Sequence, residues 1–281
     1  MKDADPTANA PLNSMRHRLF SARHAADAYL AKTSLDGHLY SRVNLNGRPT
    51  LLPKPFTYIL EGENRQSQSL TFYDNAGEHF QPGSDGTSNP VTHHLAHADL
   101  WCFLFDPSKD ASFRKHLKSS KDPQLSRRYP TESQELLLSE LENRIRILHQ
   151  PSPLGKLNTP LAFILNKSDM IQDWEPIEKL KDPWNGRHFN SLIVEDNFQI
   201  LREGLRERVP AIVARAESLS EKVIYFASSS LGHSPRQIKT GELSPIPKKI
   251  NPRGVEIPIF WWLSSWSTVF NNQNKNLWQN S

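Results

Sequence analysis

Three short polar motifs each follow a run of apolar residues, and their residue types could recognise a small polar ligand. The motifs are DNAGE (74–78), NKSD (166–169) and SSSLG (228–232). Carboxylates and amides bind hydrogen-bond donors and metal ions, and glycine lets the backbone approach a ligand closely. Asp-x-x-Gly and a run of small residues are each weak signals, because both occur by chance in many chains. An Asn-Lys-x-Asp after five apolar residues is more specific, and the three motifs in this order indicate one shared site.

A parallel sheet could bring the three motifs together. The sequence predicts strands at 55–60, 69–74, 100–106, 161–165 and 222–228, and helices at 131–149, 196–217 and 258–270. The later strands are apolar throughout, which is typical of a parallel sheet covered by helices on both faces. Ligands of such open sheets bind beyond the carboxyl ends of the strands, where these motifs stand. The sequence therefore predicts an α/β fold with its site at that edge.

The segments before this alternation are less regular. The strands at 55–60 and 69–74 are expected to form a hairpin, and residues 34–52 a polar loop. A short helix is expected around PVTHHLAHA. Residues 15–32 can form a helix with one largely apolar side, made of Leu19, Ala22, Ala26 and Tyr29 or Leu30.

Three further positions carry expectations about packing. TESQ at 131–134 matches a capping box at the start of a helix. Cys102 lies in the apolar run LWCFLF and is expected to be a small buried side chain rather than a nucleophile. The spacing of Trp262 and Trp266 favours packing of the last helix over a partner-binding patch.

Composition narrows the class of protein. A chain of 281 residues suits one large domain, and the mean hydropathy of −0.61 is that of a polar, soluble protein. The formal charge is +4, but basic and acidic residues alternate, as in LREGLRERVP, so solvated helix faces are expected and nucleic acid is not. The single cysteine excludes an internal disulfide. No apolar stretch approaches the roughly 18 residues of a membrane span and no signal-peptide core is present, so a cytoplasmic location is expected.

With these motifs the sequence resembles P-loop GTPases of the translation-factor and Ras-like (TRAFAC) class. DNAGE is similar to the D-x-x-G switch motif of that class, NKSD to its N-K-x-D guanine-specificity motif, and SSSLG to its S-A-[KL] base loop. More narrowly, LTFYDNAGEHF, NPVTHHLAHADLWCFLFDPSKD and VEIPIFWWL resemble a family of bacterial GTPases predicted to act in multi-component conflict or stress systems. The resemblance covers roughly residues 27–268. It implies a three-layer P-loop NTPase-like fold, with a mostly parallel sheet and helices on both faces.

The resemblance implies that the second and third motifs read a guanine base. Asp169 would accept hydrogen bonds from guanine N1–H and N2–H₂, whereas adenine would leave this carboxylate unpaired at a cost. Asn166 would tie the base loop together and approach N7, and the stem of Lys167 would lie against the base plane. A backbone N–H near Ser230 would meet guanine O6. The base loop as a whole comprises Ser229, Ser230 and Leu231.

By the same resemblance the first motif would act on the phosphates. Asp74 would hold Mg²⁺ through its water shell, and the Gly77 N–H would reach the γ-phosphate of GTP. Glu78 stands where many relatives have a water-orienting glutamine, and a carboxylate there can orient water but also repels phosphate. The threonine that binds Mg²⁺ stays open among Thr33, Thr50 and Thr57. The implied partners are the guanine nucleotide, GTP or GDP, and an unidentified effector or activating protein.

One motif of this class is absent from the sequence. GTPases hold phosphate with G-x-x-x-x-G-K-[ST] at a helix N-terminus, and neither SPLGKLNTP nor IKTGE matches it. The strand that feeds this loop would lie centrally, between the strands at 69–74 and 100–106. Either the chain is an N-terminally truncated product of a longer GTPase, or it is a degenerate relative that has lost nucleotide chemistry. The intact base-reading motif favours truncation.

The sequence therefore predicts a loop-like or disordered N-terminus at 1–14, an incomplete GTPase domain at 15–270 that lacks the central first strand, and a polar tail at 271–281. The first functional hypothesis is a regulatory GTPase that switches between GTP and GDP, weak or inactive as the sequence stands because phosphate binding supplies much of the affinity. The alternative is a non-catalytic pseudo-GTPase that acts as a protein-interaction module.

Overall fold

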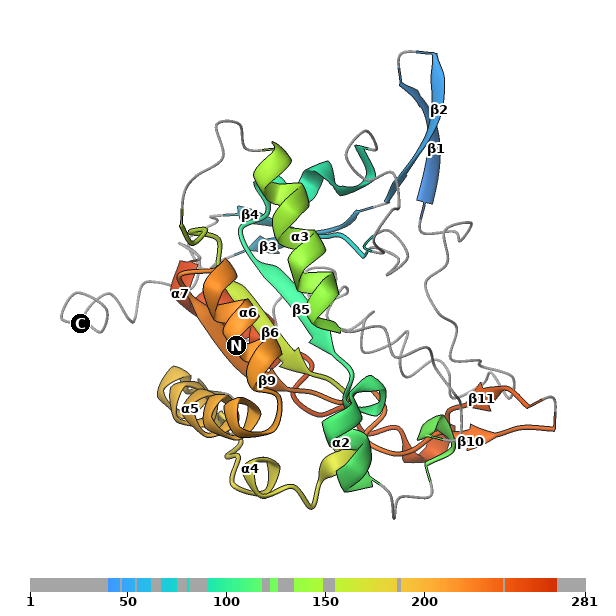
Figure 1. The fold of residues 1–281 in the computed structure, drawn as a ribbon, viewed down its shortest axis with the longest axis vertical. Helices are drawn as coiled ribbons and strands as arrows, with labels where there is room; N and C mark the ends of the chain where they lie inside the picture. The colour runs from blue at the N-terminus through green and yellow to red at the C-terminus, as the bar shows by residue number, and fades with distance from the viewer. Residues whose placement is uncertain are drawn as a thin grey trace.

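A three-stranded parallel sheet lies at the centre of the structure (Figure 1). Its order is β5-β6-β9, with β5 at Trp101–Phe105, β6 at Leu161–Leu165 and β9 at Val223–Ala227. The computed structural model describes residues 40–45, 47–53, 55–61, 67–74, 80, 90–117, 122–125, 134–148, 155–185, 188–239 and 241–266. The predicted α/β class, with a parallel sheet and helices, is confirmed.

The middle strand of this sheet is buried on both faces. Leu161 of β6 lies opposite Trp101 of β5 and Val223 of β9, and the pairing continues in register to the ends of the strands. All five residues of β6 are buried, as its uninterrupted apolar run predicts. Because successive side chains point to opposite faces, β6 contributes to two separate hydrophobic clusters.

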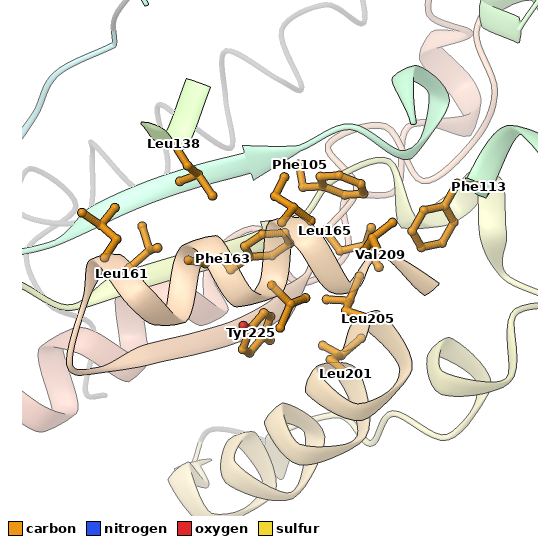
Figure 2. Packing of buried hydrophobic residues seen from close by; sticks show 14 of the residues in the cluster. Phe105, Phe113, Leu138, Leu161, Phe163, Leu165, Leu201, Leu205, Val209 and Tyr225 are labelled. Carbon is orange, nitrogen blue, oxygen red and sulfur yellow. The ribbon is translucent and has the colours of Figure 1, made fainter. Parts of the chain in front are cut away.

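The larger cluster covers one face of the sheet (Figure 2). Helices α3 (Gln134–Leu148) and α6 (Pro210–Leu219) lie over this face and share the cluster with Phe163 of β6. α2 (Ala111–His116) and α5 (Ser191–Arg208) add further buried side chains to it. Full burial of a side chain such as Phe163 contributes roughly 1.5–3 kcal/mol, so this cluster is a main source of stability.

The smaller cluster covers the opposite face. α7 (Ile257–Trp266) places Trp261 and Trp262 against Ile164 of β6 and Phe226 of β9. The rings of Phe226 and Trp261 meet edge-on, with their centroids 5.7 Å apart. Trp261 is 1% exposed and Trp262 8% exposed, so the predicted packing role of the final helix is confirmed for both.

No residue of β5 belongs to the buried set of this second cluster. Cys102 and Leu104 point to the same side as Ala162 and Ile164 of β6, yet both are exposed, Leu104 by 58%. The prediction that Cys102 is a buried side chain is therefore wrong. The reason is the position of α7, whose buried cluster contains residues of β6 and β9 and none of β5.

Two antiparallel hairpins precede the parallel sheet. β1 (Tyr40–Leu45) pairs with β2 (Arg48–Pro53), and β3 (Phe56–Glu61) pairs with β4 (Ser67–Phe72). Among the described residues each hairpin forms its own two-stranded sheet, separate from the parallel one. The β3–β4 hairpin is the one that the sequence predicts.

The β1–β2 hairpin corrects the expectation of a polar loop at 34–52. Its strands read YSRVNL and RPTLLP, and neither shows the regular apolar alternation by which a half-buried strand is recognised. The signal that was present is Asn46-Gly47, a dipeptide favoured in tight hairpin turns, and Gly47 has a φ of 80°.

Helix boundaries follow local capping chemistry. The Asn190 side chain accepts a hydrogen bond from the Leu192 N–H (3.0 Å) at the start of α5. Pro210 begins α6 and separates it from α5, as predicted, because proline is tolerated only in the first turn of a helix. α3 begins at Gln134, but the Gln134 side chain bonds the backbone N–H and carbonyl of Asp106 (2.8 and 3.0 Å) rather than forming the predicted capping box.

Several short elements complete the described chain. They are the 3₁₀ helices Pro90–His97, Pro107–Lys109, Pro123–Leu125, Ser168–Ile171 and Pro247–Lys249, the helix α4 (Glu175–Glu178), and the two-residue strands β7 (Trp184–Asn185), β8 (His188–Phe189), β10 (Arg236–Gln237) and β11 (Leu243–Ser244). None of the described helices is long and apolar enough to cross a membrane. The predictions for 1–14, 15–32 and 271–281 lie outside the described residues.

Candidate functional site

Two of the three predicted motifs meet at the carboxyl ends of β6 and β9. The Asn166 N–H donates to the Phe105 carbonyl and the Ser228 N–H to the Leu165 carbonyl, each at 2.9 Å. These bonds extend the ladder of the parallel sheet by one residue on each strand. The Ser168 N–H then donates to the Ser228 carbonyl at 3.0 Å, which joins the two loops directly.

The Asp169 carboxylate is held by a serine of the other loop. The Ser229 hydroxyl donates to Asp169 Oδ1 (2.5 Å) and accepts a hydrogen bond from the Gly232 N–H (2.8 Å). Ser229 is 1% exposed, so its hydroxyl has a fixed orientation. No described residue donates to the second oxygen of Asp169, which is available to a ligand.

Lys167 adopts a backbone conformation that is unusual for a residue with a side chain. Its φ of 53° and ψ of 37° are left-handed, and among the described residues it is the one non-glycine residue with positive φ. Such a conformation costs roughly 1–2 kcal/mol and persists only where the surroundings enforce it. Here Asn166 Oδ1 accepts the Lys167 N–H at 2.8 Å, and the Lys167 ammonium bonds Asp106 Oδ2 at 2.7 Å.

Asp106 is a residue of this site that the sequence prediction missed. It directly follows β5, and its Oδ1 accepts hydrogen bonds from the N–H and hydroxyl of Ser108 (2.9 and 2.6 Å). The Gln134 side chain holds its backbone from α3. The available signal was its place at the end of the apolar run LWCFLFD, the same place that Asn166 has after β6.

The SSSLG loop at 228–232 is supported by backbone hydrogen bonds from residues 251–253. Ser229 and Arg253 exchange backbone hydrogen bonds, both at 2.9 Å, and the Asn251 N–H donates to the Leu231 carbonyl at 2.9 Å. Gly232 has a φ of +69°, and a Cβ there would lie 2.0 Å from the Asn251 carbonyl oxygen, so only glycine fits. The sequence contains no motif at residues 251–253 that would indicate this supporting role.

Ser230 and Leu231 of the SSSLG loop are at least partly accessible to solvent. Ser230 is exposed, and Leu231 is half-buried. Neither of their backbone N–H groups donates to a described residue. The two loops therefore offer two backbone donors and one carboxylate oxygen that no described residue uses, and such groups can form hydrogen bonds with a polar ligand.

The first motif is only partly described. Asp74 is exposed and follows β4, which belongs to the separate antiparallel hairpin. Gly77 and Glu78 lie outside the described residues. Within the described part of the chain no group of three or more His, Cys, Asp or Glu side chains could hold a metal ion.

The positions of the three candidate threonines do not identify one of them as a magnesium ligand. Thr50 belongs to β2, and Thr57 lies in β3, where its hydroxyl is 3.3 Å from that of Thr71. Thr33 lies outside the described residues.

A hollow elsewhere on the surface has no connection with these motifs. It lies between α2, α4 and α5, and its polar lining includes His116, Asp173, Glu175, Glu207 and Arg208. His116 and Asp173 pair with each other at 3.4 Å, and Asp173 is 78% exposed. Its wide exposure and mixed charge give no defined ligand chemistry, so the two joined loops are the better candidate.

The two joined loops must be interpreted from their own geometry and motifs. No family model matches the chain, and neither a curated protein nor a solved structure matches it.

Proposed function

We propose that this chain is a guanine-nucleotide-binding domain of the regulatory GTPase type, with a P-loop NTPase-like arrangement of its parallel sheet. The hydrogen bond between the Ser229 hydroxyl and the Asp169 carboxylate is the observation that carries the proposal. It joins the NKSD and SSSLG motifs, since the two residues are 60 positions apart in the sequence, and the second oxygen of Asp169 has no donor among the described residues.

The proposed chemistry of base recognition follows from the donors and acceptors of the two loops. Asp169 accepts hydrogen bonds from guanine N1–H and N2–H₂, and the Ser230 N–H donates to guanine O6. Adenine presents an amino group where guanine has O6 and lacks the N1 proton. Binding adenine would therefore leave the carboxylate and the N–H unpaired, each at a cost of about 1–3 kcal/mol.

The phosphate end of the nucleotide belongs to the DNAGE motif in this proposal. Asp74 would hold Mg²⁺ through water, the Gly77 N–H would donate to the terminal phosphate, and Glu78 would orient a water molecule. Mg²⁺ when bound would neutralise charge on the phosphates during hydrolysis. An effector or activating protein would read the state of this segment.

A non-hydrolysing interaction module is a second candidate. The observation that favours it is the sequence itself, which contains no G-x-x-x-x-G-K-[ST]. Without that loop the affinity rests on base contacts, so guanosine and GTP would bind about equally weakly. Tight binding of GDP or GTP that depends on Mg²⁺ would exclude this candidate.

The test is a titration of the chain with fluorescent GDP, ADP and XDP in the presence of Mg²⁺. We expect GDP to bind at least about 10-fold more tightly than ADP, which corresponds to one lost hydrogen bond to a charged group. In Asp169→Asn the preference should move from guanine toward xanthine, because xanthine has an acceptor oxygen at C2 that pairs with the amide of asparagine.

The matched control is Asp196→Asn, since Asp196 is an exposed carboxylate on α5. This variant should keep the preference of the unchanged protein. An unaltered preference in Asp169→Asn, or equal binding of GDP and ADP by the unchanged protein, would refute the assignment of the base.

A further inference from the structure

The imidazole of His233 bridges the SSSLG loop and a later segment of the chain. His233 directly follows this loop, and its Nδ1 lies 3.0 Å from the Leu231 carbonyl oxygen. On the other side of the ring, the Ile246 N–H donates to Nε2 at 3.1 Å. The residue is half-buried, and none of the base contacts proposed above uses it.

These two contacts determine which ring nitrogen carries the proton. Nε2 accepts a hydrogen bond and therefore carries none, and a carbonyl oxygen can only accept, so Nδ1 carries the proton and donates it. The ring is therefore neutral, with its one donor directed at the Leu231 carbonyl and its one acceptor at the Ile246 N–H. In this form His233 connects the SSSLG loop to residue 246 through two hydrogen bonds.

The segment that supplies the Ile246 N–H is itself held beside the loop. Strands β10 and β11 pair antiparallel and return the chain, and both residues of β11 are buried. The 3₁₀ helix Pro247–Lys249 follows, and beyond it the Asn251 N–H donates to the Leu231 carbonyl at 2.9 Å. This carbonyl is therefore fixed by two donors, one from His233 and one from Asn251.

A continuous series of hydrogen bonds connects the ring with Asp169. The Leu231 carbonyl and the Gly232 N–H belong to one planar peptide, so a bond that fixes the first also fixes the direction of the second. The Gly232 N–H donates to Ser229 Oγ at 2.8 Å, and the Ser229 hydroxyl donates to Asp169 Oδ1 at 2.5 Å. Because the serine oxygen receives the Gly232 proton, its own proton is directed to the carboxylate.

We propose that His233 is a positioning residue for base recognition: it holds the Leu231–Gly232 peptide, and through this peptide and Ser229 it keeps Asp169 in place. The consequence for ligand binding rests on the proposed function, in which Asp169 reads guanine. Adenine offers this carboxylate no matching donors, so loss of the contact between His233 and Leu231 should weaken the binding of GDP and leave that of ADP unchanged. A residue that only stabilised the fold would weaken the binding of both nucleotides.

Two amide replacements separate the two hydrogen bonds of the ring. The asparagine amide nitrogen reaches the position of Nδ1, so His233→Asn keeps the donor to Leu231 and loses the acceptor for Ile246. The glutamine amide oxygen reaches the position of Nε2, so His233→Gln keeps the acceptor and loses the donor. Because both side chains carry the same functional group, each variant is the control for the other.

Hydrogen exchange of the Gly232 amide, measured by NMR without nucleotide, reports directly on the peptide that His233 holds. We expect this amide to exchange about 5-fold faster in His233→Gln, which corresponds to the loss of one neutral hydrogen bond, and at an unchanged rate in His233→Asn. The urea midpoint should be lower in His233→Asn than in His233→Gln, because the half-buried Ile246 N–H loses its acceptor. Equal exchange of the Gly232 amide in the two variants would overturn the proposal, whatever the chain binds.

Titration with fluorescent GDP and ADP measures the consequence for base recognition. The preference for GDP over ADP should fall about 5-fold in His233→Gln, through weaker GDP binding alone, and stay within about 2-fold of the original in His233→Asn. His116→Gln, at the half-buried histidine of the separate surface hollow, should keep the preference. An unaltered preference in His233→Gln, or an equal loss of GDP and ADP affinity, would overturn the proposal. Equal binding of the two nucleotides by the unchanged protein would instead refute the proposed function.

Discussion

At the scale of single residues, the candidate site depends on side chains that hold one another in place. A free aspartate samples several rotamers, but Asp169 is held by the Ser229 hydroxyl, which is itself bonded to the Gly232 N–H. Lys167 keeps a costly left-handed backbone because its N–H and its ammonium are both bonded. The two loops therefore hold these side chains in fixed orientations without a ligand, which is the preorganisation that the proposed base recognition requires.

Replacing the serine tests this orientation. Ser229→Ala removes the donor to Asp169 and leaves the partly buried Gly232 N–H without its acceptor. We expect the affinity for GDP to fall about 10-fold and the free energy of unfolding to fall by about 1–2 kcal/mol. Titration with fluorescent GDP and urea denaturation measure the two effects. Ser218→Ala, at an exposed serine of α6 outside the two loops, is the control, and equal effects in both variants would contradict the role of Ser229.

At the scale of elements, one ion pair joins two helices to the sheet. Arg202 of α5 donates to both carboxylate oxygens of Glu217 of α6, at 2.6 and 3.1 Å. The hydroxyl of Tyr225 in β9 also contacts Glu217, at 3.3 Å. Partial burial raises the pKa of Glu217, but the hydrogen bond and charge of Arg202 outweigh it, so the pKa of Glu217 is lowered overall.

This shift predicts how the pair depends on pH. Because the pKa of Glu217 in the folded protein is below its ordinary value of 4.5, the pair stabilises the fold fully above about pH 4.5. The stabilisation is lost as the pH falls through the lower, folded pKa. We expect Arg202→Met to reduce the free energy of unfolding by about 1–2 kcal/mol at pH 7 and by clearly less near pH 3.

Urea denaturation at the two pH values measures this difference. The control is Lys179→Met, which breaks the exposed Lys179–Glu175 pair and should leave the free energy of unfolding nearly unchanged at both pH values, because solvent screens the pair. A loss in Arg202→Met that is the same at both pH values would show that the arginine acts through packing alone.

At the scale of the whole molecule, stability comes from a sheet buried between two clusters of apolar side chains. Phe163 lies at the middle of the larger cluster, and its ring centroid is within 5.2–5.6 Å of those of Phe103, Phe105 and Tyr225. Phe163 belongs to β6, and its ring packs against residues of β5 and β9. Its loss should therefore destabilise the whole described α/β unit and not a single helix.

Phe163→Ala tests this cooperativity. We expect the free energy of unfolding to fall by about 3–5 kcal/mol, because a cavity replaces a fully buried ring. Leu192→Ala, at a residue that is 55% exposed on α5, should change it by less than about 0.5 kcal/mol. Urea denaturation followed by far-UV circular dichroism and by tryptophan fluorescence measures both. Different midpoints for the two signals would contradict a single cooperative unit.

Elements governed by local patterns were predictable from the sequence. β6 has the predicted bounds, because five apolar residues stand between Pro160 and Asn166. The break between α5 and α6 falls at Pro210, since proline cannot continue a helix. The β1–β2 hairpin was missed because YSRVNL and RPTLLP lack the regular apolar alternation that marks a strand.

The sequence by itself determined which chemical groups follow each strand and that the apolar strands β5, β6 and β9 belong to a parallel sheet. Only the tertiary structure decided which of these groups meet. The pairing of Lys167 with Asp106, the support of Ser229 by Arg253 and the exposure of Cys102 all depend on which distant segment lies beside each residue. A local pattern shows which side of one helix or strand is buried, but it does not show which distant segment packs against that side. Such contacts are decided only when the chain packs in three dimensions.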